Sequence, residues 1–313
     1  MIGIVILNYN NSEDTINCIQ SILRYNTSSV KIVVVDNASP RPDAVEKIIL
    51  YFEENFKKDF SLAEDLAGTT LPKYTFVKSL KNGGYAQGNN IGLDLLYKDD
   101  EIDYIMILNN DILFIEDIIP EMIKCYEQIP DAGIVSPLLL KKDCQSIDYN
   151  CARKRYDVYE RIKQFWLWML HIKCKVKKNR RIFLAHPQLL DEKIVPIDLP
   201  SGSCMLTKKD FFCSIGGFDP NTFLYFEEDI LFAKTSRKGK VNYILPQIKC
   251  VHLGAQSIGA EKRSVFQIEQ SYKSELYYVM SYSDLNLLKK LAFWVSANTY
   301  RFYRLVSFKI KKT

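Results

Sequence analysis

Three polar residues interrupt a run of apolar residues near the middle of the chain. The stretch YIMILNNDILF spans residues 104–114, and its apolar run stops at Asn109-Asn110-Asp111 before resuming at Ile112. A carboxylate oxygen is a ligand that Mg²⁺ and Mn²⁺ prefer, and these ions need few protein ligands when phosphate groups supply the others. We therefore predict that Asp111 holds a divalent metal ion, Mn²⁺ or Mg²⁺, which neutralises charge on a departing diphosphate.

Polar residues also follow three other apolar stretches in the first half of the chain. These stretches are IGIVIL (2–7), KIVVVD (31–36) and YTFVKS (74–79), and their polar ends are Asn8-Tyr9-Asn10, Asp36-Asn37 and Asn82-Gly83-Gly84-Tyr85. Such continuous apolar runs are typical of strands that are covered on both faces. Ligands of parallel sheets bind beyond the carboxyl ends of the strands. Four polar ends at one edge therefore predict a binding site to which Asn8, Asn37, Asn109 and Asn110 belong.

Asp36 follows three valines and could bind a nucleoside. Its carboxylate could accept hydrogen bonds from ribose hydroxyls or from a base N–H. An acid also ends the second strand of dinucleotide-binding folds, and Asp-Asn-x-Ser also suits a helix N-cap. The glycine pattern of dinucleotide-binding folds is missing after the first strand, which argues against NAD. We predict that Asp36 and Asn10 hold the nucleoside of a donor.

A glycine-rich stretch, NGGYAQGNNIG, occupies residues 82–92. It matches neither a Walker A loop nor the dinucleotide fingerprint. Glycines let the backbone approach a ligand, and the N-terminus of a following helix favours anions. A flexible turn would explain Gly83-Gly84 alone, but Gly88-Asn89-Asn90 adds a second polar cluster one turn later. We therefore predict that this stretch, which includes Gly84, Tyr85 and Asn89, contacts a ligand and favours an anion.

The elements that must position these residues alternate along the first 140 residues. Strands are expected at 2–7, 31–36, 74–79, 103–108 and 132–137. Helices are expected between them, the first capped by Ser12, the third from about residue 88 to 97 and the fourth near 116–128. This alternation predicts an α/β fold with a mostly parallel central sheet, flanked by helices and joined by right-handed crossovers. Residues 56–73 are expected to form an irregular insertion.

Composition limits the class of protein. The chain has 313 residues, 47% of them hydrophobic and 25% charged, which predicts a globular protein with a large core. The N-terminal sequence MIGIVILNYN has no basic region and is typical of a strand, and no apolar run reaches the roughly 18 residues of a spanning helix. The eight cysteines form no CxxC pair, which indicates neither a zinc site nor a disulfide framework. A cytoplasmic location is expected.

Two segments carry most of the positive charge. Residues 153–181 hold eleven Lys and Arg against two acids, and residues 285–313 hold seven and no acid, within a net charge of +5. Both segments also contain Trp and Phe, and both suit an interfacial helix that contacts anionic lipid. A solvated basic face, or packing of the C-terminal helix on the body or into a homodimer, is the alternative. Nucleic acid is not an expected partner.

The order of the motifs resembles that of the family-2 glycosyltransferases, especially the bacterial branch that includes rhamnosyltransferases. The matching motifs span about residues 2–259 and read VILNYNNSEDTINCIQSI, VVVDNAS, KNGGYAQGNNIGL, ILNNDI, LPSGSCMLTKKDFFCSIGGFD, FLYFEEDIL and VHLGAQS. The resemblance implies a GT-A domain over residues 1–259, with a nucleotide-binding half (1–140) and an acceptor-side half (141–259). Residues 260–313 would form a C-terminal basic amphipathic helical extension.

The resemblance also assigns roles to individual residues. Asn109-Asn110-Asp111 takes the place of the family's DxD motif, with Asn109 at the position of the first acid. Gly202 lies in a motif that lines the space between donor and acceptor. By the same resemblance, Gly84, Tyr85 and Asn89 would shape the sugar and diphosphate region. His252 matches a histidine near the diphosphate or metal, and Ser257 follows it in the same motif.

An acidic motif of the family carries the general base of inverting enzymes, and Glu227-Glu228-Asp229 resembles it. Such a base takes the proton from the acceptor hydroxyl as that oxygen attacks the anomeric carbon. Asp229 is the first choice because Glu228-Asp229 matches the Glu-Asp pair, whereas alignment on Gly239 favours Glu228. Three acids at the start of a helix can also simply complement the helix dipole.

The resemblance implies an inverting glycosyltransferase. Its donor would be a UDP- or dTDP-sugar, with rhamnose as one candidate, and its acceptor a growing, lipid-linked bacterial glycan of a capsule or lipopolysaccharide. The enzyme would then work at the inner face of the cell membrane. Two other functions are alternatives. A nucleotidyltransferase needs a basic glycine-rich loop that NYNNSED lacks, and a non-catalytic binding module would not need Glu227-Glu228-Asp229.

Overall fold

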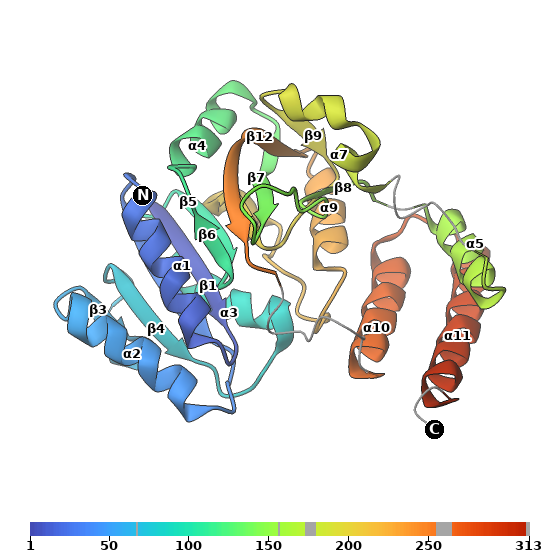
Figure 1. Cartoon of the computed structure of the whole chain (residues 1–313), viewed down its shortest axis with the longest axis horizontal. Coiled ribbons are helices and arrows are strands. Elements are labelled where there is room, and N and C mark those ends of the chain that lie inside the picture. Colours follow the sequence, from blue (N-terminus) through green and yellow to red (C-terminus); the bar gives the residue numbers. More distant parts are fainter. Residues whose placement is uncertain (67, 156, 173–179, 255–264, 311–313) are drawn as a thin grey trace.

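A computed structural model describes residues 1–66, 68–155, 157–172, 180–254 and 265–310 of the chain. Within these ranges one ten-stranded sheet runs through the molecule in the order β3-β4-β2-β1-β5-β11-β7-β12-β6, with β9 paired to β12 (Figure 1). The strands are β1 (Ile2–Asn8), β2 (Val30–Asp36), β3 (Phe60–Leu62), β4 (Tyr74–Lys78), β5 (Tyr104–Asn109), β6 (Ile112–Phe114), β7 (Ala132–Lys141), β9 (Val195–Ile197), β11 (Cys204–Lys208) and β12 (Val241–His252). Two further short strands, β8 (Ala152–Arg153) and β10 (Leu199–Pro200), pair with each other.

Helices cover both faces of this sheet. One apolar cluster packs against α1 (Ser12–Tyr25), α2 (Pro42–Phe56) and α4 (Ile119–Gln128). A second cluster packs against α3 (Gly84–Lys98) and α8 (Lys209–Ser214). Alternate residues of β1 point to opposite faces, so Ile4 and Ile6 belong to the first cluster and Val5 to the second. Burial on both faces explains why these strands are apolar without interruption.

The strands that precede the predicted site are parallel neighbours. β1 pairs with β2 and with β5, and β2 pairs with β4, all in parallel. The register places Asn8 opposite Asp36, and Leu7 opposite Asn109. The predicted parallel sheet and the shared edge of its polar strand ends are therefore confirmed. Antiparallel β11, which separates β5 from β7, was not predicted.

Three local predictions are corrected by the structure. The cap of α1 is Asn11 rather than Ser12, because the Asn11 side chain accepts a hydrogen bond from the backbone N–H of Asp14. Residues 56–73 are not wholly irregular, since β3 extends the edge of the sheet beside β4 and a short 3₁₀ helix, η1 (Ala63–Asp65), follows. Helix α3 starts at Gly84, about four residues earlier than predicted.

The acceptor-side half of the chain shares the same sheet through β11 and β12. Helix α7 (Ile182–Ala185) and the 3₁₀ helix η2 (Pro187–Asp191) precede β11 in the chain, and α9 (Glu227–Arg237) lies between β11 and β12. The division of residues 1–259 into two halves stays a prediction.

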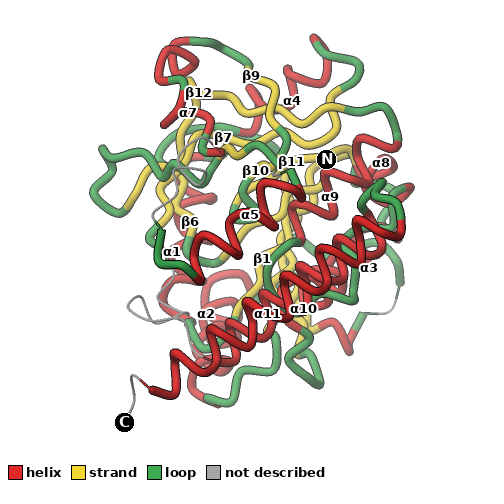
Figure 2. The backbone as a smooth tube through the Cα atoms, turned by 90° about the vertical axis from the view of Figure 1, so that its right-hand side faces the viewer, coloured by secondary structure: helices red, strands yellow, loops and turns green. Residues whose placement is uncertain are grey.

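Three helices form a separate layer beside the sheet. These are α5 (Val158–Met169), α10 (Val265–Tyr282) and α11 (Leu287–Ile310), and Figure 2 looks onto this side of the molecule. A third apolar cluster joins them to α9 through Phe165, Ile230, Val279 and Phe293. Arg161 on α5 also donates to Glu275 on α10, with Nη2 and Oε2 2.8 Å apart. The basic segments therefore pack against the body along one face.

The opposite face of α11 carries exposed apolar side chains. They recur at helical spacing and comprise Leu287, Leu288, Leu291, Trp294, Val295, Phe302 and Val306. We call this set the α11 apolar stripe. No helix among the described residues has both the length and the apolar character needed to cross a bilayer. Residues 173–179 and 311–313 of the basic segments lie outside the described residues.

Candidate active site

Buried amides join the ends of β1, β2 and β5. Asn8 Nδ2 donates to Asp36 Oδ1 at 2.8 Å. Asn110 Nδ2 donates to Thr15 Oγ1 at 3.0 Å and lies 3.5 Å from Asn8 Oδ1. Asn8 and Asn110 are both buried. In the structure these two predicted donor-binding residues hold the strand ends together, and their direct contact with a donor stays a prediction.

Asp36 organises the turn that follows β2. Its Oδ2 accepts the backbone N–H of Ser39 at 3.0 Å. The hydroxyl of Ser39 in turn accepts the backbone N–H of Asn10 at 2.8 Å, and Asn10 adopts a left-handed φ of 59°. The N-cap position of helix α2 is Arg41, which makes no side-chain capping bond, so the helix-cap interpretation of Asp36 is wrong. Asp36 and Asn10 are thus neighbours, as a shared nucleoside contact requires, and that contact stays a prediction.

The glycine-rich stretch is held against the end of β2 by Asn37. Asn37 Nδ2 donates to the carbonyl of Gly84 at 3.0 Å, and its Oδ1 accepts the N–H of Gly83 at 3.1 Å. Gly84 has a φ of +75°, and a Cβ there would lie 2.0 Å from the carbonyl oxygen of Phe223. Only glycine fits this position. Asn89 is buried one turn into α3, where its Nδ2 donates to the carbonyl of Tyr85 at 2.9 Å.

Gly202 links the donor-side residues to the acids. Its carbonyl accepts the hydroxyl of Tyr85 at 2.6 Å, and its N–H donates to Glu228 Oε1 at 3.2 Å. The next residue, Ser203, accepts the backbone N–H of Asn109 through its carbonyl at 2.9 Å. The loop before β11, which contains Gly202, therefore connects three other predicted site residues. They are Tyr85 of α3, Glu228 of α9 and Asn109 of β5.

The two predicted metal ligands, Asp111 and His252, lie side by side. Asp111 Oδ2 is 3.4 Å from His252 Nε2, and Asp148 Oδ2 is 3.0 Å from His252 Nδ1. Burial lowers the pKa of His252, but hydrogen bonds to the two carboxylates outweigh burial and raise it to about 9. Asp111 Oδ1 is buried and has no hydrogen-bond partner among the described residues. Ser257 lies outside the described residues.

This arrangement fits a divalent cation whose other ligands are phosphate oxygens. A buried carboxylate oxygen without a partner costs free energy, which a cation would offset. In the described part of the chain no three His, Cys, Asp or Glu side chains form a group that could hold a metal ion. Mg²⁺ is often bound by only one or two carboxylates when the substrate supplies phosphates. Asp111 could serve in that way, and His252 could join it when the metal displaces the proton that its raised pKa retains at neutral pH. These roles stay predictions.

The acids at the start of α9 have different surroundings. Glu228 Oε1 lies 3.1 Å from Arg153 Nη2, in addition to its bond with Gly202. Glu227 is buried, and burial, followed by the charge of Glu228, raises its pKa to about 8. Glu227 therefore holds its proton at neutral pH, whereas Glu228 has two partners for a negative charge.

Asp229 is the acid whose surroundings best suit proton transfer. It is buried, and its Oδ1 has no hydrogen-bond partner among the described residues, with Arg180 Nη2 4.0 Å away. Burial raises the pKa of Asp229 to about 6, although the charges of Arg153 and Arg180 oppose this shift. A carboxylate with this pKa is mostly ionised at pH 7 and still basic enough to accept a proton.

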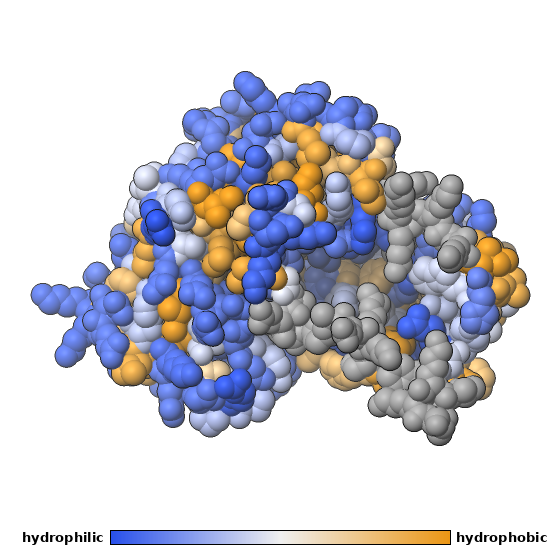
Figure 3. All heavy atoms as spheres, in the orientation of Figure 1, coloured by the Kyte–Doolittle hydropathy of each residue, from blue (hydrophilic) through white to orange (hydrophobic). Residues whose placement is uncertain are grey.

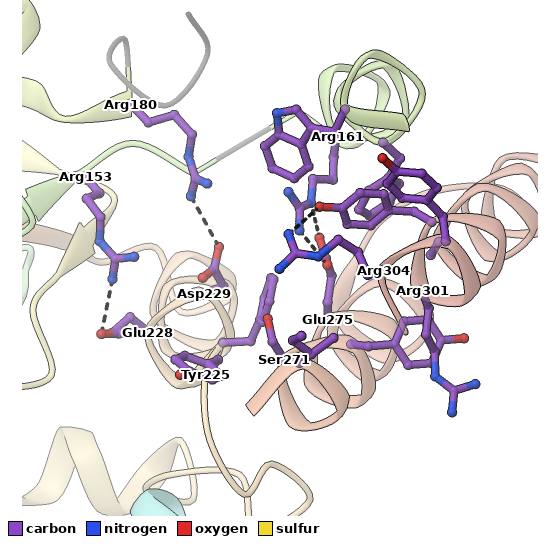
Figure 4. Close-up of a pocket in the computed structure, with 18 of the residues that line it drawn as sticks. Arg153, Arg161, Arg180, Tyr225, Glu228, Asp229, Ser271, Glu275, Arg301 and Arg304 are labelled. Atoms are coloured by element: carbon purple, nitrogen blue, oxygen red, sulfur yellow. Dashed lines mark hydrogen bonds and ion pairs between the residues drawn. The ribbon is translucent and has the colours of Figure 1, made fainter. Parts of the chain in front are cut away.

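A large cavity opens beside these acids. It has a volume of about 910 Å³ and is lined by Glu228, Asp229 and residues of α5, α10 and α11. Figure 3 shows the molecule hollowed between the sheet and the C-terminal helices, and Figure 4 shows Glu228 and Asp229 on one side of the cavity. The cavity has room for an acceptor next to Asp229.

Three residues of the site were missed by sequence reasoning. Asp148, Arg153 and Arg180 contact His252, Glu228 and Asp229 across 104, 75 and 49 residues of chain, respectively. None lies in a motif, and Arg153 and Arg180 were counted only as members of a basic segment. Charge alone could not show that two arginines of that segment face the acid pair.

A mostly parallel sheet with these polar strand ends, facing an acidic helix start, is the arrangement that the family resemblance implied. The chain belongs to glycosyl transferase family 2, since the sequence model described as Glycosyl transferase family 2 matches residues 3–187.

Two curated relatives are consistent with this family. One is the N-acetylglucosaminyl-diphospho-decaprenol L-rhamnosyltransferase of Mycobacterium tuberculosis, 24% identical over 167 residues, which are 52% of this chain and 50% of that protein. Another is the low-salt glycan biosynthesis hexosyltransferase Agl10 of Haloferax volcanii, 23% identical over 243 residues, which are 77% of this chain and 63% of that protein. The chain thus spans about half to two thirds of the length of these relatives. They confirm the resemblance to the rhamnosyltransferase-like branch.

A solved structure supports the fold. The crystal structure of GalNAc-T7 with UDP, GalNAc and Mn²⁺ superposes with a TM-score of 0.59 at 13% identity, covering 100% of this chain and 57% of that one. The GT-A fold expected from the sequence is thereby confirmed.

Proposed function

We propose that the protein is an inverting glycosyltransferase that moves a sugar from a nucleotide-diphosphate donor to a hydroxyl of a glycan acceptor. The observation that carries this proposal is Asp229, a buried carboxylate with a pKa near 6 that opens onto a large cavity. Glu228 and Gly202 connect it to Tyr85 in the glycine-rich stretch. Hydrogen bonds thus join the donor region to Glu228, the residue that precedes the proposed base at the start of α9.

The proposed reaction is a single displacement. The acceptor oxygen attacks the anomeric carbon from the side opposite the diphosphate, and Asp229 removes the proton of that hydroxyl. The bond from the anomeric carbon to the diphosphate breaks, and the nucleoside diphosphate leaves, so the configuration inverts. A divalent ion held by Asp111 and His252 would neutralise charge on the diphosphate. Glu228, paired with Arg153, holds Gly202 in position.

The printed names of the relatives guide the finer assignment. One relative is named for the transfer of L-rhamnose to a diphospho-decaprenol glycan, and the other for hexosyl transfer in glycan synthesis. We propose a UDP- or dTDP-sugar as donor and a lipid-linked glycan of a capsule or lipopolysaccharide as acceptor. The enzyme would act at the cytoplasmic face of the membrane.

Nucleotide-sugar binding tests this function. We expect one of UDP-glucose, UDP-galactose, UDP-GlcNAc and dTDP-rhamnose to stabilise the protein by about 2.7 kcal/mol at a hundred times its dissociation constant. Thermal shift with Mn²⁺ measures this effect. The protein should also hydrolyse the same donor slowly and release its sugar to water. If none of the nucleotide sugars binds, a non-catalytic module is favoured. If the protein releases pyrophosphate from a nucleoside triphosphate, a nucleotidyltransferase is favoured.

The α11 apolar stripe predicts peripheral binding to anionic membranes. Phe302 is 71% exposed and Leu288 76% exposed. We expect the double variant Leu288→Glu/Phe302→Glu to bind anionic vesicles at least about tenfold more weakly at low salt, since each buried apolar side chain contributes about 1.5–3 kcal/mol. Co-sedimentation with phosphatidylglycerol vesicles measures this change. Deleting α11 is a poorer test, because the deletion would also remove Phe293 from the third core cluster and so disturb the fold.

The matched control is Leu50→Glu, which alters an exposed leucine of α2 on the sheet body. It should bind vesicles as the wild type does. Equal recovery of the wild-type protein with neutral and anionic vesicles would contradict membrane binding. So would a double variant that sediments as well as Leu50→Glu.

A further inference from the structure

The cavity beside Asp229 carries an excess of positive charge. Among the described residues, six arginines line it, against the three carboxylates of Glu228, Asp229 and Glu275; the arginines are Arg153, Arg161, Arg180, Arg181, Arg301 and Arg304. They come from segments that lie far apart in sequence and meet only in the folded chain. Guanidinium groups taken out of water cost free energy unless anions compensate them. The charges of the lining residues therefore favour an anionic ligand.

The three lining carboxylates are already paired within the protein. Arg153 pairs with Glu228 and Arg180 with Asp229, at 3.1 Å and 4.0 Å. The Arg161 pair with Glu275, described above, is the third. Among the described residues, the lining arginines outside these three pairs are Arg181, Arg301 and Arg304.

Two of those arginines lie on α11, across the cavity from Asp229. Figure 4 shows Arg301 and Arg304 on the side opposite Glu228 and Asp229. Arg301 pairs with Glu269 at 2.9 Å. Arg304 donates to the hydroxyl of Tyr300 at 3.0 Å, and among the described residues no carboxylate forms an ion pair with it. Both arginines therefore join the lining of the cavity from α11, whereas the candidate base joins it from α9.

The walls at this end are aromatic. Phe165 stacks on Tyr300 with ring centroids 5.0 Å apart, and Arg161 lies over Phe165 at 4.5 Å. Trp168 also lines the cavity. Arginines held on aromatic rings keep their planar donor forks in a fixed direction, which suits bidentate binding of phosphate.

We propose that this cavity binds the phosphate groups of a lipid-linked acceptor, a proposal that rests on the sugar-transfer function above. Phosphate oxygens would lie at Arg304, on the side of the cavity formed by α11, while the acceptor sugar extends across the cavity to Asp229. The lipid chain would leave along the α11 apolar stripe, which lies on the same helix as Arg301 and Arg304. Helix α11 would thus bind the phosphate on one face and contact the lipid chain on the other.

The test is titration of the full-length protein with farnesyl diphosphate, farnesol and inorganic diphosphate. EDTA and saturating UDP are present throughout, so that the donor site and metal do not contribute. Quenching of tryptophan fluorescence reports binding, because Trp168 lines the cavity. Farnesyl diphosphate should bind at least tenfold more tightly than farnesol, which lacks the charge, and than inorganic diphosphate, which lacks the lipid.

Variants locate the binding site. Arg304→Gln should weaken farnesyl diphosphate binding about tenfold or more, the usual effect of losing a hydrogen bond to a charged group. Arg304→Lys should recover part of the affinity, because it keeps the charge and loses the fork. Arg24→Gln is the matched control, since Arg24 also lies over an aromatic ring, Tyr25, but at the end of α1. It should bind as the wild type does.

Several results would overturn the proposal. Equal affinity for farnesyl diphosphate and farnesol would exclude a phosphate site, and equal affinity for inorganic diphosphate would exclude recognition of the lipid. An Arg304→Gln protein that binds like Arg24→Gln would move the site elsewhere. The sugar-transfer function is decided separately, by nucleotide-sugar binding to the wild-type protein. Failure of farnesyl diphosphate to bind would therefore contradict the phosphate site without contradicting sugar transfer.

Discussion

Asp229→Asn is expected to lower kcat for sugar transfer by about 10²–10⁴, the usual contribution of a general base. The substitution keeps the size of the side chain and removes its ability to accept the proton of the acceptor hydroxyl. Donor binding should change little, because Asp229 faces the cavity and the donor-side contact of this helix is made by Glu228. Steady-state transfer rates, with donor affinity measured separately by thermal shift, check this expectation.

Glu228→Gln is the informative comparison for this variant. It should disturb Gly202 and the pair with Arg153, and so weaken donor binding or positioning more than proton transfer. A larger loss of kcat in Glu228→Gln than in Asp229→Asn would assign the base to Glu228. Loss of donor binding with unchanged kcat in Asp229→Asn would make Asp229 structural.

The pH dependence of the rate gives an independent measure of the same group. Burial raises the pKa of Asp229 to about 6, and a general base must be unprotonated to act. The rate of transfer by the wild-type protein should therefore fall tenfold for each pH unit below about 6 and level off above it. The residual activity of Asp229→Asn should not show this fall in rate below pH 6.

Asp111→Ala is expected to abolish metal-stimulated turnover, a loss of about 10²-fold or more, because charge neutralisation by a bound metal is worth several kcal/mol. Asp111 provides a buried oxygen without a hydrogen-bond partner in the described chain, directly at the end of β5. Turnover measured against Mn²⁺ concentration checks the expectation, and circular dichroism checks that the variant folds. Wild-type rates in this variant at saturating Mn²⁺ would show that the metal ligand lies elsewhere.

Asp148→Asn serves as the graded control for the metal site. Asp148 contacts the far nitrogen of His252, so its change should weaken metal affinity by about 10–100-fold, as loss of a residue behind a metal ligand does. Saturating Mn²⁺ should then restore the rate, which it should not do for Asp111→Ala. This contrast separates binding of the metal from orientation of its ligand.

Much of the fold could be predicted because the parallel strands are apolar on both faces. The strands β1, β2 and β5 appear in the sequence as unbroken apolar runs, since α1 covers one face and α3 the other. Polar residues at their ends were predicted to share one edge, and parallel pairing confirms it. Antiparallel β11 could not be predicted, because its partner β5 lies about 100 residues earlier and short apolar runs do not encode strand direction.

The roles of single residues in the site were less predictable. Asn8, Asn110 and Asp36 were predicted to contact a donor, and the structure shows them bonded to one another or to neighbouring turns. A polar residue at a strand end looks the same in sequence whether it faces a ligand or a buried amide. Pairing of Asp111 with His252 could be inferred only through the family resemblance, and the structure brings them within 3.4 Å.

The sequence by itself determined the family, the order of the strands and helices of the first half, and the motifs that supply the acids and amides. These follow from local patterns of apolar spacing and from motif order, which do not depend on distant contacts. Only the tertiary structure decided that Arg153 and Arg180 face the acids, that Asp229 is buried enough to raise its pKa, and that α5 and α11 form one cavity. Burial and pairing of these charges arise when segments at least 49 residues apart meet, and no local pattern records which of many basic residues will do so.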